Sequence, residues 1–227
     1  MTKQIFGALL FIFSFSIGKA QDHVLEYGII AGINFNNARG NALNKEFADN
    51  LKGYAFGGLV KMNLTNKFGV KLQLQYEQNG WAYRELIFEN STGTGLVKGD
   101  ILYKLNYLNL PVSAEYSFGN KTIFNLNAGL FFGFSLNGKT IVKEPTGSGI
   151  ITHTTTAKTK TTNNGITVGA GMQIPIATSI KLGIGLQDNL GLKNINPSSG
   201  LPQSSISTNS FLIHTGVTFI LNKKSNS

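Results

Sequence analysis

The segment Phe68-Gly69-Val70-Lys71-Leu72-Gln73-Leu74-Gln75-Tyr76-Glu77 alternates strictly between two kinds of side chain. Every even position is apolar or aromatic, and every odd position is Gly, Lys, Gln or Glu. A period of two residues is typical of a β-strand with one apolar and one polar face. About ten such residues, tilted to the membrane normal, cross the hydrocarbon core of a bilayer. The segment is therefore predicted to be a membrane-spanning strand.

Similar alternation recurs along the chain and predicts eight strands in all. They are expected at residues 27–36, 52–64, 68–78, 101–116, 122–136, 165–176, 180–188 and 210–221. Long connections at residues 37–51, 79–100, 137–164 and 189–209 alternate with short turns. Outer-membrane barrels place short turns in the periplasm and longer loops outside, and eight is the smallest usual strand number. The sequence thus predicts an all-β, eight-stranded antiparallel up-and-down transmembrane β-barrel in the outer membrane, with periplasmic termini and extracellular long loops.

The two faces of these strands differ in polarity. The polar face carries Lys61, Lys71, Gln73, Gln75, Glu77, Asn109, Glu115, Asn125, Lys181, Gln187, His214 and Thr218. Charged side chains on the lipid face cost roughly 2–4 kcal/mol at mid-bilayer, so this face is expected to line the interior. Eight strands enclose a space just wide enough for side chains to fill. A salt-bridged, hydrated interior is expected, with a narrow solute or ion path as the alternative.

The N-terminus has the parts of a secretory signal. Lys3 supplies the positive charge, residues 5–17 are mainly apolar, and Gly18-Lys19-Ala20 provides small residues before a cut. The apolar run is too short to be a membrane-spanning helix. We therefore expect residues 1–20 to be a signal peptide and residues 21–227 to be the outer-membrane β-barrel domain. With no Cys in the chain, disulfides and thiolate chemistry are excluded.

The basic residues are scattered along the chain. The formal net charge is +9, and removal of the leader leaves 18 basic and 11 acidic residues. Because no basic patch is interleaved with aromatic residues, no nucleic acid partner is expected. Attraction to anionic lipid or polysaccharide head groups is the interpretation that suits an exported protein.

Histidine is the one candidate for catalysis. His214 falls on the inward face of the last strand, but a triad needs a nucleophile, a base and an orienting acid within hydrogen-bond reach. Ser113 and Ser135 fall on strands across the barrel, so a structural role is favoured for His214. His23 and His153 are too far apart in the sequence to suggest a metal site. No catalytic residue, metal or cofactor is expected.

Two segments are ambiguous. In residues 101–107 the apolar side chains occupy odd positions, whereas from Leu108 onward they occupy even ones. Either a β-bulge near Tyr107 switches the faces, or this part rises above the membrane, where alternation relaxes. The Thr-rich stretch 147–164 either extends a hairpin above the membrane or is a mobile loop.

Three motifs resemble the PorT-type outer-membrane β-barrel proteins of Bacteroidetes, whose barrels are of the small OmpA/OmpX-like kind. These are the Gly-x-Asn-Phe ending of residues 27–35, the strand-to-loop passage of residues 72–80, and Tyr107-Leu108-Asn109-Leu110-Pro111-Val112. The resemblance implies the barrel fold and the outer membrane, and its namesake takes part in protein export. A departure is the C-terminus, where residues 222–227 trail beyond Phe219 and Leu221.

The functional hypothesis is a non-enzymatic outer-membrane protein that is structural or recognises a partner through its outer loops. One alternative is an accessory component of a PorT-like (type IX) protein secretion machine. Another is a small barrel hydrolase or lipid-modifying enzyme that uses His214, and a soluble lipocalin-like barrel is the structural rival. Expected partners are outer-membrane lipid and lipopolysaccharide, the barrel-insertion machinery, and a surface or secretion-system protein.

Overall fold

The computed structural model describes residues 24–40, 48–90, 93, 95–146, 149–157, 159–196 and 205–221. The predicted signal peptide, residues 1–20, and the trailing residues 222–227 lie outside the described residues. Within the described ranges, no helix is long and apolar enough to cross a membrane.

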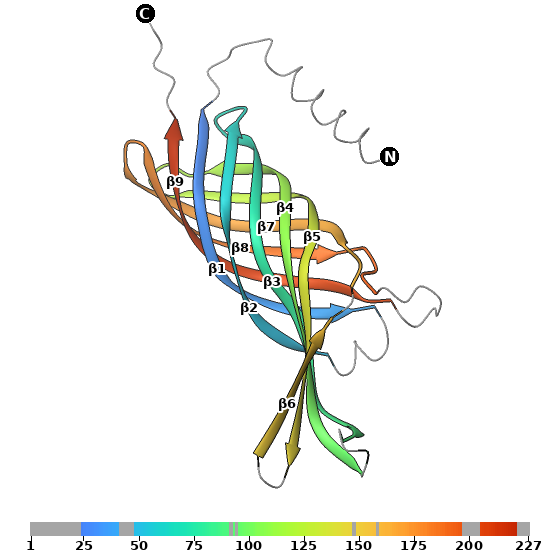
Figure 1. Ribbon diagram of the computed structural model, residues 1–227. Coiled ribbons are helices and arrows are strands. Elements are labelled where there is room, and N and C mark those ends of the chain that lie inside the picture. The colour runs from blue at the N-terminus through green and yellow to red at the C-terminus, as the bar shows by residue number, and fades with distance from the viewer. Residues whose placement is uncertain are drawn as a thin grey trace, which may run out of the picture.

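The described residues form nine strands, all paired antiparallel (Figure 1). They are β1 (Leu25–Arg39), β2 (Ala48–Asn63), β3 (Phe68–Glu89), β4 (Leu96–Phe118), β5 (Ile123–Thr146), β6 (Gly149–Thr156), β7 (Thr162–Ala177), β8 (Ile180–Gly191) and β9 (Ser207–Leu221). Eight of these strands correspond to the eight predicted ones, and β6 is additional.

Eight strands close into a ring, and β6 stands outside it. Neighbours in the ring follow the order β1, β2, β3, β4, β5, β7, β8, β9, and β9 pairs back onto β1. The closing pair runs without a register shift from Leu25↔Leu221 to Arg39↔Ser207. Closure leaves no sheet edge within the ring, which a membrane-spanning sheet requires because lipid offers no hydrogen bonds. The predicted eight-stranded antiparallel barrel is confirmed.

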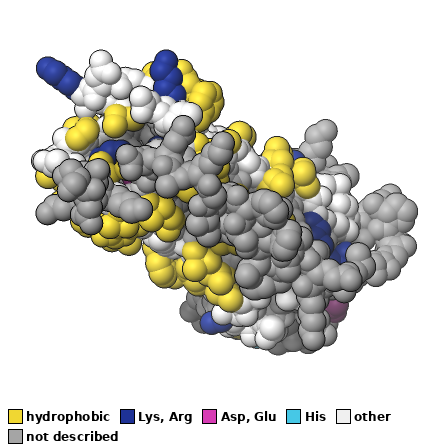
Figure 2. All heavy atoms as spheres, turned by 90° about the horizontal axis from the view of Figure 1, so that it is seen from above, with side chains coloured by type: hydrophobic (Ala, Val, Ile, Leu, Met, Phe, Trp, Pro, Cys, Tyr) yellow, Lys and Arg dark blue, Asp and Glu magenta, His cyan; other side chains and the backbone are white. Residues whose placement is uncertain are grey.

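The polar face of each ring strand points inward, as predicted. Lys61, Gln75 and Glu77 are buried, whereas Ile29 and Leu130 expose 66% and 54% of their surface on the outer wall. Hydrophobic side chains gather on the part of this wall that is visible in Figure 2. An apolar exterior around a polar interior fits a lipid-facing barrel and contradicts the lipocalin-like rival, which needs the reverse.

Three ring strands continue past the ring and, with β6, form a protruding sheet, which corrects two predicted loops. Residues 79–100 and 137–164 were expected to be long connections, but β3, β4 and β5 run through much of them and β6 is added. Asn79-Gly80 and Asn137-Gly138 have the composition of turns. In the structure Gly80 instead takes a φ of 151° within β3, and β5 runs on through Gly138. The stretch 147–164 was expected to be either an extension of a hairpin or a mobile loop. Its residues Gly149–Thr156 form β6, which pairs with β5, so the hairpin alternative is correct for them.

The irregular strand keeps one face inward along its length. Leu105 and Tyr107 are fully buried and lie on the same side of β4 as Asn109. Of the two alternatives for this strand, the one in which a bulge switches its faces is therefore excluded, although an irregularity does occur near Tyr107. The register shift occurs in its partner, because Asn106 pairs with Asn137 and Tyr107 with Ser135, leaving Leu136 as the extra residue of a bulge in β5.

The lipid-facing wall gives a stability prediction. Ile184 is exposed near the middle of β8, so Ile184→Arg should lower the free energy of unfolding in phospholipid vesicles by about 2–4 kcal/mol. Leu192, just beyond the end of β8, is the matched control, and Leu192→Arg should change it by less than about 1 kcal/mol. Urea titration measures both values. Equal losses in the two variants would contradict a lipid-facing wall.

Candidate functional site

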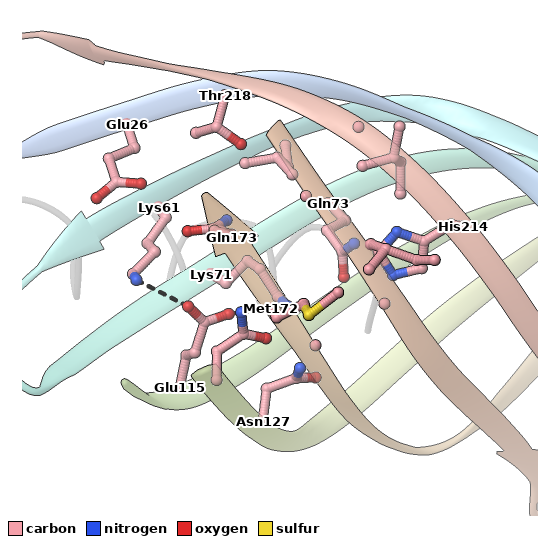
Figure 3. A pocket seen from close by; sticks show the side chains of 18 of the residues that line it. Glu26, Lys61, Lys71, Gln73, Glu115, Asn127, Met172, Gln173, His214 and Thr218 are labelled. Atoms are coloured by element: carbon pink, nitrogen blue, oxygen red, sulfur yellow. Dashed lines mark ion pairs between the residues drawn. The ribbon is translucent and has the colours of Figure 1, made fainter. Parts of the chain in front are cut away.

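Ion pairs fill the end of the interior nearest the short turns. The Glu115 carboxylate lies 2.7 Å from Nζ of Lys61 and 3.0 Å from Nζ of Lys71, and Glu26 lies 2.8 Å from Nζ of Lys181. These side chains come from five strands, and Figure 3 shows Lys61 and Lys71 on the same side of the lumen as Glu115. Paired charges reduce the large cost of burying each charge alone. The expected salt-bridged interior is confirmed for these residues.

A cavity of about 50 Å3, with both polar and apolar lining residues, lies beside these ion pairs. His214, Gln73, Asn127 and Gln173 line it together with Lys61 and Lys71 (Figure 3). A water molecule needs roughly 10–15 Å3 of such space, so a few waters fit, which agrees with a hydrated interior.

The cavity does not assemble a catalytic triad within the described part of the chain. Nδ1 of His214 is buried without a hydrogen-bond partner, and so is Oγ of Ser113. An orienting acid would have to accept a hydrogen bond from this imidazole. His153 lies on exposed β6, far along the chain from His214, and His23 is outside the described residues. Among the described residues, no group of three or more His, Cys, Asp or Glu side chains could hold a metal ion.

Glu77 is the most highly connected side chain of the middle interior. It is fully buried, and its two oxygens accept hydrogen bonds from side chains on both sides of the lumen. Oε1 accepts from Asn34 and Ser210, and Oε2 accepts from Asn109 and Asn189. The four donors are neutral, and no ion pair to Glu77 occurs among the described residues. The side-chain N–H and O–H groups of β1, β4, β8 and β9 thus stabilise the carboxylate in place of a positively charged partner.

An apolar plug closes the interior toward the long loops. Its buried members are Ala38, Trp81, Tyr83, Leu105, Tyr107 and Ile195. Tyr103 stacks on Trp81 with 4.9 Å between ring centroids. Sequence reasoning missed this plug because it assigned the apolar phase of every strand to lipid. The apolar odd positions of residues 101–107 were the signal that could have found it.

The protruding sheet extends beyond the ring at one end of the barrel (Figure 1). It consists of residues 84–89 of β3, 96–106 of β4, 137–146 of β5, and all of β6. All eight residues of β6 are exposed, and Ile150 exposes 68% of its surface. The sheet lies at the same end of the ring as the apolar plug, opposite the short turns.

The hydrogen bonds to Glu77 give a second stability prediction. In Glu77→Gln the new amide NH2 must face one pair of donors, so the free energy of unfolding should fall by about 2–4 kcal/mol. Glu89 lies on the same strand but is exposed, and Glu89→Gln should cost less than about 0.5 kcal/mol. Urea unfolding in phospholipid vesicles measures both. A Glu77→Gln variant as stable as Glu89→Gln would show that the carboxylate is not the organising group.

Solved structures of several bacterial outer-membrane proteins are similar to this chain in fold. Ail, the attachment invasion locus protein of Yersinia pestis, is 13% identical, with 86% of this chain and 98% of Ail covered and a TM-score of 0.42. Neisserial surface protein A is 14% identical over 85% and 96%, with a TM-score of 0.44. OprG from Pseudomonas aeruginosa is 11% identical over 90% and 98%, with a TM-score of 0.45. No curated protein matched the sequence.

The family comparison covers most of the chain. Residues 19–196 match the model described as the outer membrane protein beta-barrel domain. The match includes β1 to β8, and the structure closes the ring with β9. The chain therefore belongs to this family of outer-membrane β-barrel proteins.

Proposed function

We propose that this protein is a non-enzymatic outer-membrane barrel that recognises a partner outside the cell through its protruding sheet. The observation that carries the proposal is the sheet itself, in which β3, β4 and β5 continue beyond the ring and gain a ninth strand. Ring closure does not need these residues. Ordered, exposed structure at a loop end is where binding residues are commonly found on rigid scaffolds.

The lengths of the connections support the proposed orientation. Short turns join β2 to β3, β4 to β5, and β7 to β8 at one end, where β1 begins and β9 ends. Outer-membrane barrels place such turns in the periplasm. The protruding sheet would then face the outside, with lipid and lipopolysaccharide around the apolar wall and the barrel-insertion machinery as a transient partner.

The interior supports a structural role rather than a catalytic or conducting one. Ion pairs, the hydrogen bonds of Glu77 and the apolar plug occupy successive levels of the lumen. His214 faces a cavity without a hydrogen bond to its Nδ1. The hydrolase alternative therefore lacks the geometry that would favour it.

A role beside a secretion machine is the second candidate. It rests on the PorT-type motifs, of which Gly32-Ile33-Asn34-Phe35 contributes Asn34 to the Glu77 site. In that case the partner of the protruding sheet would be a component or a cargo of protein export, and the organism would belong to the Bacteroidetes.

The absence of Cys allows one experiment to test both orientation and recognition. His153→Cys places a thiol on exposed β6, and Asn66→Cys places one in the exposed turn between β2 and β3. Intact cells are treated with a membrane-impermeant maleimide that carries a photoreactive group. We expect labelling of His153→Cys and, after illumination, a discrete cross-linked adduct of higher mass.

The turn-side variant is the control. Asn66→Cys should be labelled only after the outer membrane is permeabilised, and should not give the same adduct. Labelling of Asn66→Cys on intact cells would reverse the orientation. Labelling of His153→Cys without any adduct would leave the orientation intact and contradict recognition by the protruding sheet.

A further inference from the structure

The free edge of β6 is the last strand edge of the sheet. The strand order ends at β6, which among the described strands pairs only with β5, over eight consecutive residue pairs without a register shift. Its sequence, Gly149-Ile150-Ile151-Thr152-His153-Thr154-Thr155-Thr156, holds neither Pro nor a charged residue. Natural sheets usually protect an exposed edge with Lys, Pro, a bulge or a covering segment. This edge has none of the first three.

The opposite edge of the same protruding sheet is protected. Residues 84–89 of β3 contain a register shift at Arg84 and Glu85, and Glu85 takes a φ of 55°. Glu85 pairs with Lys98 at 2.9 Å, and Arg84 pairs with Asp49 at 3.3 Å. A β-bulge and charged side chains along an edge both discourage the addition of another strand. The β3 edge of the sheet is therefore protected against the addition of a strand, whereas the β6 edge is not.

The backbone groups on the free edge follow from the ladder. The N–H of Ala157 donates to the carbonyl of Gly138, which fixes the alternation of hydrogen-bonded pairs between β5 and β6. The N–H and C=O groups of Ile150, Thr152, Thr154 and Thr156 consequently point away from β5. Those of Ile151, His153 and Thr155 point toward it. The outward set is spaced to pair with an extended chain.

Three lysines share one face of this sheet. Lys104 is directly opposite Lys139, and Lys143 is on the same face of β5, between Asp100 of β4, whose nearest cation is Arg84, and Thr152 of β6. Like charges directly opposite each other are destabilising. Among the described residues, no carboxylate forms an ion pair with any of the three. An added strand would lie about 10 Å from β5, within the combined reach of a lysine and a glutamate across the small Thr side chains.

We propose that the edge of β6 binds an extended polypeptide segment as an additional β-strand, and that acidic side chains at alternate positions of this segment face Lys139 and Lys143. The proposal rests on the proposed function, since it names the chemistry of the partner that the protruding sheet recognises. Main-chain hydrogen bonds supply the attachment and side chains at every second position supply specificity in such complexes.

Self-pairing of β6 is the competing occupant. Antiparallel pairing of two β6 edges in one sheet requires a two-fold axis perpendicular to that sheet. Because the hairpin of β5 and β6 projects away from the barrel along its length, that axis would place the two barrels in opposed membranes (Figure 1). A foreign segment has no such restriction.

The test uses the full mature chain in lipid nanodiscs and a peptide of four Val-Glu repeats. Binding is followed by fluorescence anisotropy, and amide hydrogen exchange is followed by NMR. We expect the Val-Glu peptide to bind at least tenfold more tightly than a Val-Lys peptide. Exchange should slow at the outward amides of Ile150, Thr152, Thr154 and Thr156, and should not change at His153 and Thr155.

Matched variants separate the backbone and charge contributions. Thr154→Pro removes one outward donor but leaves the inward pairs of His153 and Thr155, so binding should fall at least tenfold while the barrel stays resistant to SDS. Thr155→Ala, whose backbone points toward β5, should bind normally. The double variant Lys139→Glu/Lys143→Glu should favour the Val-Lys peptide instead. A Val-Glu peptide methylated at alternate amide nitrogens should not bind.

Several results would overturn the proposal. Equal affinity for the Val-Glu and methylated peptides would exclude strand addition. Binding that depends on the lysines but leaves the outward amides unprotected would indicate an anionic surface ligand such as lipopolysaccharide. A dimer that protects the same amides without peptide would make a second copy the occupant. If the peptide fails but the adduct at His153→Cys persists, recognition by the protruding sheet stands and only the edge chemistry is wrong.

Discussion

The closed ladder of backbone hydrogen bonds is the constraint on which the rest of the structure depends. A sheet in hydrocarbon must pair every N–H and C=O group, and a ring of strands meets this demand because it has no edge. Here the closure is the antiparallel pairing of β1 with β9, from Leu25↔Leu221 to Arg39↔Ser207. Once the ring is closed, strand alternation sends one set of side chains to lipid and the other inward. Both the apolar wall and the polar interior therefore follow from the closure of the ring.

Eight strands also fix the width of the interior, and the chain fills it in levels. Lys61 and Lys71 share Glu115 at the turn end, Glu77 accepts four hydrogen bonds in the middle, and the Trp81–Leu105 region of the plug seals the loop end. The donors to Glu77 come from strands on both sides of the lumen. Each level therefore joins strands that are not neighbours in the ring, and it adds cross-links that the backbone ladder alone does not provide.

The ring strands and the polarity of their faces could be predicted from the sequence, because lipid imposes strict alternation on residues such as those of 68–77. The ion-pair partners could not, since the meeting of Lys181 with Glu26 depends on strand tilt and register across the lumen. The protruding sheet was underestimated because alternation loses its physical cause outside the membrane. Asn79-Gly80 and Asn137-Gly138 then read as turns. Leu105 and Tyr107 were read as an irregularity, although they form part of an inward-facing plug.

The contrast between the sealed ring and the free edge of β6 links fold to function: the same chain removes every edge within the barrel and leaves one open outside it. The most direct test of this account is amide hydrogen exchange of the mature protein in lipid nanodiscs, compared between the β1–β9 seam and the β7–β8 pair. The account predicts equally strong protection of Ile29–Phe35, Phe211–Val217 and the paired amides of β7 and β8. Rapid exchange confined to β1 and β9 would mean that the ring is open there, and would contradict the closed barrel.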